Sequence, residues 1–91
     1  MKSRQKNPPA AEPLVSIIMP FKNAVDFIGD CLNSITNQSY ANWELIAVND
    51  NSTDAGRTVV QQYAANDDRI RLFENPHSGI ISALQFGLNK C

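Results

Sequence analysis

The run Trp43-Glu44-Leu45-Ile46-Ala47-Val48 gives the clearest indication of architecture, and the polar cluster Asn49-Asp50-Asn51-Ser52-Thr53-Asp54 follows it directly. The first run has the length of a strand and is mainly apolar, whereas the cluster after it is rich in turn-forming residues. We therefore predict a buried strand over 43–48 and a loop over 49–54.

A similar strand and a helix precede this run. Leu14–Met19 is rich in strand-forming residues, and Pro20 is expected to end the strand because proline lacks a backbone N–H. The helix is predicted to begin at Asp26, as its cap, and to end near Asn37. Its apolar residues recur at helical spacing: Phe27, Ile28, Cys31, Leu32 and Ile35.

The alternation continues towards the C-terminus. A second helix is predicted after Asp54, a third strand over 69–73, and a third helix over 80–88 that is entered through Ser78 and Gly79. Strands and helices that alternate at roughly thirty residues per unit are typical of parallel strands joined by crossover helices. We predict an α/β fold in which three successive strand-helix units form a Rossmann-like parallel sheet.

Length and composition exclude several classes of protein. The 91 residues suffice for one small domain or part of a larger one, with 43% hydrophobic and 19% charged residues. A net charge of −1 argues against nucleic-acid binding. The apolar stretch 14–21 is shorter than the ~20 residues of a membrane span. With two cysteines and no apolar signal core, the chain is expected to be cytoplasmic, with residues 1–13 as a flexible leader.

Ligands of open parallel sheets bind beyond the carboxyl ends of the strands, so the loops 20–23, 49–54 and 74–78 are the candidates. The first loop lacks the glycines of dinucleotide-binding folds, and no Walker loop follows any strand. Asp50 carries an acceptor-only carboxylate that suits a base N–H or ribose hydroxyls. The alternative is that Asp50, Ser52 and Asp54 form turns and cap the next helix.

Two residues of the first loop have plausible nucleotide-binding roles. Lys22 is placed to meet a diphosphate, and Phe21 to stack on a base, although an exposed lysine and a core phenylalanine are the simpler alternatives. No metal site is predicted: His77 is the only histidine and has no partner at ligand spacing. Asp67 and Asp68 precede a strand, so we assign them to a turn at the opposite end of the sheet.

Three ordered blocks of sequence resemble the opening of the family 2 glycosyltransferases, over nearly all of 14–91. They are Val15-Ser16-Ile17-Ile18-Met19-Pro20-Phe21-Lys22-Asn23, then Ser34-Ile35-Thr36-Asn37-Gln38-Ser39-Tyr40-Ala41-Asn42-Trp43-Glu44-Leu45-Ile46, then Val48-Asn49-Asp50-Asn51-Ser52-Thr53-Asp54. The resemblance implies the N-terminal, nucleotide-binding half of a glycosyltransferase-A fold.

The resemblance also implies roles for individual residues. The segment matching Pro20, Phe21, Lys22 and Asn23 lines the base pocket in that family, and the acid matching Asp50 accepts a hydrogen bond from the base, usually uracil. The donor is therefore expected to be a UDP-sugar. Family members often carry an aromatic residue at the position of Lys22 and a second aspartate at the position of Asn49, so the chain departs from the family pattern at both.

The family holds its divalent metal, Mg or Mn, with an Asp-x-Asp motif after a fourth strand, and its catalytic base comes later. This chain stops at Cys91, before either element. The expectation is a truncated donor-binding portion, 14–91, that binds no metal, holds no catalytic residue and is inactive alone. The full-length enzyme is expected to be cytoplasmic or peripheral to the membrane.

Two other functions remain open. A sugar nucleotidyltransferase shares this fold class, but it needs a glycine-rich, basic loop after the first strand, which 20–23 does not provide. A non-catalytic association module is the second alternative, in which an exposed sheet edge or exposed helix faces pair with another copy of the chain.

Overall fold

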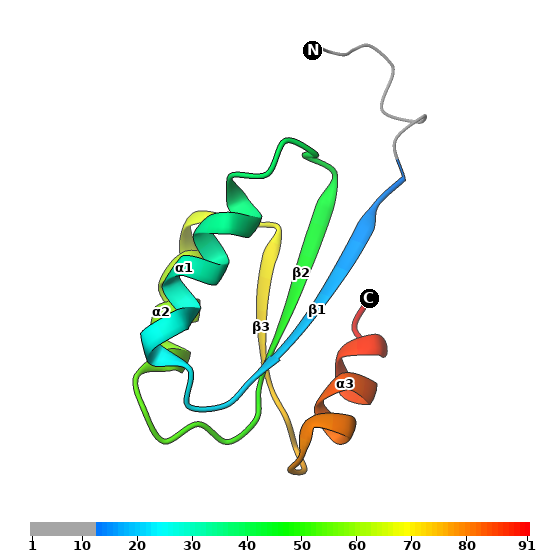
Figure 1. Ribbon diagram of the computed structural model, residues 1–91. Coiled ribbons are helices and arrows are strands. Elements are labelled where there is room, and N and C mark those ends of the chain that lie inside the picture. Colours follow the sequence, from blue (N-terminus) through cyan, green and yellow to red (C-terminus); the bar gives the residue numbers. More distant parts are fainter. Residues whose placement is uncertain (1–12) are drawn as a thin grey trace.

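The computed structural model describes residues 13–91, which form one parallel sheet with helices on both faces (Figure 1). The elements alternate as predicted: β1 (Val15–Phe21), α1 (Val25–Thr36), β2 (Trp43–Asn49), α2 (Gly56–Asn66), β3 (Ile70–Glu74) and α3 (Ile80–Leu88). The predicted α/β class and all six elements are confirmed. The predicted leader lies outside the described residues except for Pro13.

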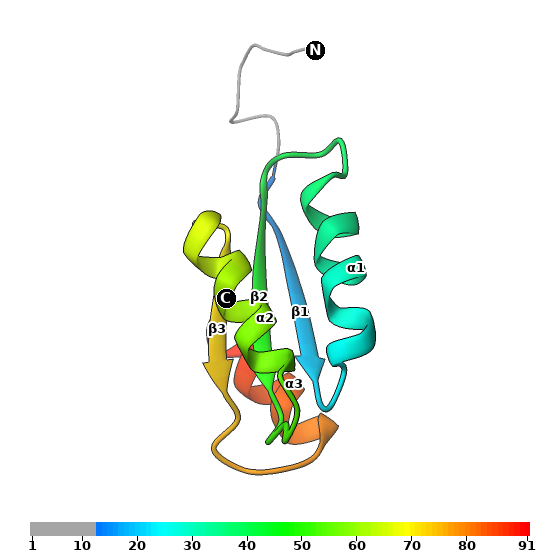
Figure 2. The ribbon, with the colours of Figure 1, turned by 90° about the vertical axis from the view of Figure 1, so that its left-hand side faces the viewer.

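The three strands run parallel in the order β1-β2-β3. Phe21 pairs with Asn49, and Asn49 pairs with Glu74, so all three strands end at the same edge of the sheet. Helices α1 and α2 cover one face and α3 covers the other, as Figures 1 and 2 show from two directions. This edge is where the loops that follow the strands meet.

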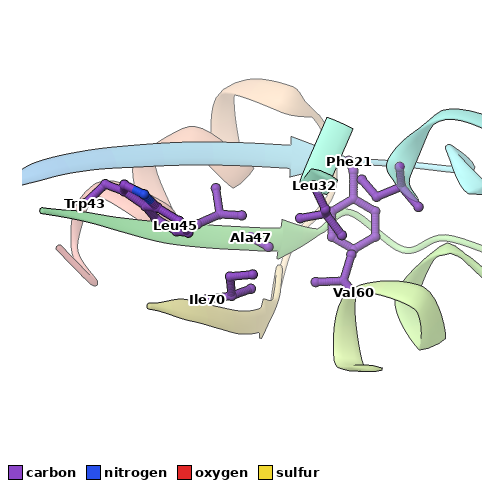
Figure 3. Close-up of a cluster of buried hydrophobic side chains, with 8 residues drawn as sticks. Phe21, Leu32, Trp43, Leu45, Ala47, Val60 and Ile70 are labelled. Carbon is purple, nitrogen blue, oxygen red and sulfur yellow. The ribbon is translucent and has the colours of Figure 1, made fainter. Parts of the chain in front are cut away.

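The central strand β2 is buried on both faces because helices cover both sides of the sheet, and alternate side chains of a strand point to opposite sides. Leu45 and Ala47 join the core beneath α1 and α2, where Figure 3 shows them with Trp43 and Ile70. Ile46 and Val48 face α3 and pack with Ala83, together with half-buried residues of the neighbouring elements. Two small cores, one on each side of β2, therefore hold the sheet in place.

Pro20 does not end the first strand as predicted, because β1 continues through Pro20 to Phe21. The Val15 N–H donates to the Asn42 carbonyl (3.0 Å), and the Asp50 N–H donates to the Phe21 carbonyl (2.8 Å). The backbone N–H and C=O groups of the odd-numbered residues of β1 therefore point towards β2. The backbone of Pro20 points towards the unpaired edge of β1. Its missing N–H costs no ladder hydrogen bond there, which is why an edge strand tolerates proline.

The predicted cap of the first helix is also wrong. The helix begins at Val25, so Asp26 lies inside its first turn and no side chain of the preceding residue caps it. Asp54, from the loop after β2, accepts a hydrogen bond from the Val25 N–H through Oδ2 (3.1 Å) and one from the Gly56 N–H through Oδ1 (2.9 Å). One carboxylate thus supports the N-terminal ends of α1 and α2, where a negative charge is favourable.

Asp67 and Asp68 lie in the predicted turn before β3. The Ile70 N–H donates to the Asp67 carbonyl (3.0 Å), and the Arg69 guanidinium donates to both carboxylate oxygens of Asp67, at 3.0 and 2.8 Å. These hydrogen bonds from Arg69 hold the pKa of the Asp67 carboxyl below its ordinary value. Arg69 also lies over the Trp43 ring, 3.9 Å from its centroid, and closes this end of the core.

The sequence predicted no membrane span and no disulfide framework, and the structure describes residues 13–91 in both respects. None of the helices in 13–91 has the length and apolar character needed to cross a lipid bilayer. Cys31 and Cys91 are both exposed and free, so no disulfide joins them.

Candidate functional site

The loops after the three strands are hydrogen-bonded to one another at the carboxyl edge of the sheet. The Asp50 N–H bonds to the Phe21 carbonyl, and the Asn75 N–H bonds to the Asn49 carbonyl (2.9 Å). Side chains add to this backbone pairing, because Asn49 Nδ2 donates to Glu74 Oε1 (2.8 Å). The three candidate loops predicted from the sequence therefore form one continuous surface.

The Asp50 carboxylate is the buried charged group of this surface, with only 7% of the residue exposed. Its Oδ1 accepts hydrogen bonds from Asn75 Nδ2 (3.0 Å), from the Gly79 N–H (3.1 Å) and from Asn51 Nδ2 (3.4 Å). Among the described residues, its Oδ2 accepts one hydrogen bond, from the shared Gly79 N–H at 3.2 Å. These donors are all neutral, so none of them is a cation paired with the carboxylate, and Oδ2 keeps unused acceptor capacity.

A pocket of about 240 Å³ opens beside this carboxylate, lined by Pro20, Phe21, Lys22, Asp50 and Ile80. Apolar walls that surround a few charged groups, here Lys22 and Asp50, are typical of sites for small organic ligands. The structure thus brings four predicted site residues, Pro20, Phe21, Lys22 and Asp50, around one concave space.

Phe21 and Lys22 lie differently within this group. Phe21 is 6% exposed, and its ring is part of the core with Leu32 and Val60, as Figure 3 shows. Lys22 is exposed and lines the pocket, and within 13–91 its ammonium has no hydrogen bond or ion pair. Contact of Lys22 with a diphosphate and stacking of Phe21 on a base stay predictions.

Asn23 and Ser52 join the first and second loops but do not line the pocket. The Asn23 N–H donates to Ser52 Oγ (3.1 Å), and Asn23 Oδ1 accepts from the Thr53 N–H (2.7 Å). Asn23 has a φ of 51°, in the left-handed region that asparagine tolerates better than most residues. These hydrogen bonds show that Asn23 and Ser52 hold the two loops together. Contact of either residue with a nucleotide stays a prediction.

Sequence reasoning missed Asn75, Gly79 and Ile80, all from the segment after β3. Gly79 has a φ of 99°, which favours glycine, and this turn aims its N–H at Asp50. The loop 74–78 was placed at the correct edge of the sheet, but nothing in its composition marked Asn75 as a partner of Asp50. Only the pairing of β2 with β3 brings the two residues together.

No three metal-ligating side chains come together among residues 13–91. His77 lies in the loop after β3, where its N–H donates to Asn75 Oδ1 (3.2 Å) and its carbonyl accepts from Asn51 Nδ2 (2.9 Å). This part of the chain therefore offers binding groups for an organic ligand but no ligand set for a divalent cation.

A second pocket lies at the opposite end of α1 and α2. It measures about 390 Å³ and is lined by Thr36, Gln62, Tyr63, Asn66 and Asp67. Its charged group, Asp67, is already paired with Arg69 (2.8 Å), so the pocket offers no unpaired charge to a ligand. The smaller pocket at Asp50 is the better candidate because a buried carboxylate with free acceptor capacity faces it.

Comparison with known protein families shows that residues 16–91 match Glycosyl transferase family 2. The putative teichuronic acid biosynthesis glycosyltransferase TuaG of Bacillus subtilis is 48% identical over 61 residues, which cover 67% of this chain and 24% of that protein. Glycosyltransferase GlyA of Streptococcus pneumoniae is 36% identical over 75 residues, 82% of this chain and 11% of that protein.

A solved structure is also similar, the mannosyltransferase PcManGT from Pyrobaculum calidifontis in complex with GDP-Man and Mn²⁺. The TM-score is 0.77 at 27% sequence identity, and the match covers 85% of this chain and 24% of the other. The chain thus spans about a quarter or less of the length of these three proteins.

Proposed function

Because this chain belongs to glycosyl transferase family 2, we propose that residues 14–91 are the donor-binding portion of an enzyme that transfers a sugar from a nucleotide-sugar to an acceptor hydroxyl. The fold is the N-terminal part of a glycosyltransferase-A fold, in agreement with the similar mannosyltransferase structure. The family assignment favours this function over the sugar nucleotidyltransferase alternative.

The observation that carries the proposal is the buried Asp50 carboxylate in the lining of the pocket. A carboxylate with neutral donors on one oxygen and free capacity on the other is suited to accept an N–H from a base. Pro20 and Ile80 supply apolar walls for the flat faces of that base. Lys22, at the rim, is placed to attract the donor diphosphate.

We further propose a UDP-type donor. GDP-Man, the ligand in the similar mannosyltransferase structure, is a nucleotide-sugar with a different base. Uracil presents one N–H, at N3, on the edge that a carboxylate reads, whereas guanine presents two adjacent N–H groups. A carboxylate with one oxygen already engaged by Asn75 and Gly79 matches the single donor better.

The sugar-transfer step itself needs groups that residues 13–91 do not bring together. The similar mannosyltransferase contains Mn²⁺, and a divalent metal, Mg or Mn, is expected for the full-length enzyme. The described residues bring no three metal-ligating side chains together, so they do not fit this ion. We propose that the 91-residue chain binds nucleotide without transferring sugar, and that the full-length enzyme works at the cytoplasmic side, in solution or peripheral to a membrane.

Association with a second copy stays a prediction beside this function. Within the described sheet, β1 pairs only with β2, and its other edge is open. Ile80, Ile81 and Leu88 of α3 are each more than half exposed, at 64%, 70% and 63%. Light scattering across a range of concentrations measures whether two copies associate.

Titration of the chain with UDP, followed by backbone amide chemical shifts, tests the proposed function. We expect shifts at millimolar UDP confined to the loops after β1, β2 and β3, and weaker shifts with GDP at the same concentration. Trp43 lies at the opposite end of β2, so its fluorescence is a less direct readout than the amides. A stronger response to GDP would contradict the uracil assignment, and no response to either nucleotide would contradict the function.

A further inference from the structure

The side chain of Asn75 lies directly beside Asp50 and is buried, with 5% of the residue exposed. Asn75 follows β3, and its backbone N–H continues the pairing with β2 by donating to the Asn49 carbonyl (2.9 Å). The residue therefore has a fixed backbone position one step beyond the paired strands. None of the nucleotide-binding roles above has been assigned to it.

Every polar group of the Asn75 side chain has a partner, and the partners fix its orientation. Its Oδ1 accepts hydrogen bonds from the His77 N–H and from Ser82 Oγ, both at 3.2 Å. An amide whose oxygen receives two donors must present its NH₂ group on the other side. That NH₂ group donates to Asp50 Oδ1 at 3.0 Å, so the donor always faces the carboxylate.

This arrangement makes the surroundings of the two Asp50 oxygens unequal. Oδ1 receives Asn75 Nδ2, the Gly79 N–H and, at 3.4 Å, Asn51 Nδ2, whereas the one described donor to Oδ2 is the shared Gly79 N–H, at 3.2 Å. A half-turn of the carboxylate exchanges two equivalent oxygens, but any smaller turn moves the acceptor away from Asn75 Nδ2. A buried donor without an acceptor is costly, so Asn75 fixes the plane of the carboxylate.

We propose that Asn75 is a positioning residue for base recognition: it holds the Asp50 carboxylate so that one oxygen, Oδ2, is presented to a single imide N–H of the base. This proposal rests on the proposed function. Asn75 does not itself line the pocket. In this proposal it nevertheless determines whether the site prefers a base with one N–H on that edge or a base with two.

The test compares UDP with UDP methylated at N3 of uracil, which lacks the N–H that Asp50 is proposed to accept. For the wild-type chain we expect the methylated nucleotide to bind about tenfold or more weakly, the usual value of a hydrogen bond to a charged group. Asn75→Asp keeps the shape and the acceptor of the side chain but replaces its donor with a second carboxylate. We expect the affinity ratio of the two nucleotides to fall to about one in this variant.

Ser82→Ala is the matched control, because it removes the hydroxyl contact to Asn75 Oδ1 and leaves the donor to Asp50 in place. We expect this variant to keep the wild-type ratio. An equal fall of the ratio in both variants would overturn the proposal, because Asn75 would then act only through loop packing. A wild-type ratio in Asn75→Asp would overturn it as well.

The wild-type chain supplies a second measurement that does not depend on how the variant folds. The side-chain NH₂ resonances of Asn75 should shift on addition of UDP and shift much less with the methylated nucleotide, since Asn75 shares Asp50 with the base. Unmoved resonances in UDP-saturated protein would overturn the positioning role. A wild-type chain that binds both nucleotides equally would instead contradict base recognition by Asp50, so the two failures are distinguishable.

Discussion

Replacing Asp50 with asparagine is expected to weaken UDP binding by about 10- to 100-fold, the usual effect of losing a hydrogen bond to a charged group. The new Oδ1 can still accept from Asn75 and the Gly79 N–H, so the loops keep their contacts. The atom in place of Oδ2 becomes an NH₂ group, which presents a donor to the donor of the base. Titration followed by amide chemical shifts measures the change.

Asp68→Asn is the matched control for this experiment. Asp68 is exposed and lies in the turn before β3, at the opposite end of the sheet, so the same loss of one charge leaves the pocket unchanged. We expect its UDP affinity to equal that of the wild-type chain. Equal affinities of Asp50→Asn and the wild-type chain would remove Asp50 from the site.

Gly87→Ala is expected to destabilise the chain by about 1–3 kcal/mol, the usual range for overpacking a core. A Cβ at this position would lie 2.6 Å from Cγ2 of Ile18 and 3.3 Å from Cγ2 of Val48. Both contacts are with branched side chains on β1 and β2, beneath α3, and such side chains cannot swing aside easily. Denaturant unfolding followed by circular dichroism measures the free energy of unfolding.

Gly29→Ala is the control of opposite sign. Gly29 lies within α1, and a Cβ there would meet no atom within 4 Å apart from its chain neighbours and the adjacent backbone of its own helix. Alanine in an open helical position stabilises by about 0.4–1 kcal/mol, because it restricts the unfolded chain and favours the helix. If both variants changed the free energy of unfolding by the same amount, the close packing of α3 on β1 and β2 would be wrong.

The alternation of strands and helices could be predicted because it rests on local patterns. The β2 run is apolar at nearly every position, and the third helix was predicted over the same residues that the structure gives it, Ile80–Leu88. Errors arose where a local rule depends on a distant neighbour. Pro20 ends a strand only if its missing N–H would have faced another strand, and that depends on which edge of β1 is paired.

The candidate site was predictable to the same extent. A rule about parallel sheets placed the loops at one edge, and the resemblance singled out Asp50, which the structure buries beside a pocket. The partners of Asp50 were not predictable, because Asn75 and Gly79 are 25 and 29 residues away and meet it only through strand pairing and a left-handed turn. Similarly, Asp54 supports α1 across the loop, a role that spacing alone assigned to Asp26.

The position of a bound nucleotide can be determined from intermolecular nuclear Overhauser effects between the H5 and H6 protons of UDP and the protein. We predict contacts from these protons to Pro20 and Ile80, the apolar walls of the pocket at Asp50. Contacts to Thr36 and Tyr63 would place the nucleotide in the larger pocket at the opposite end of α1 and α2. That result would contradict nucleotide binding at the carboxyl edge of the sheet.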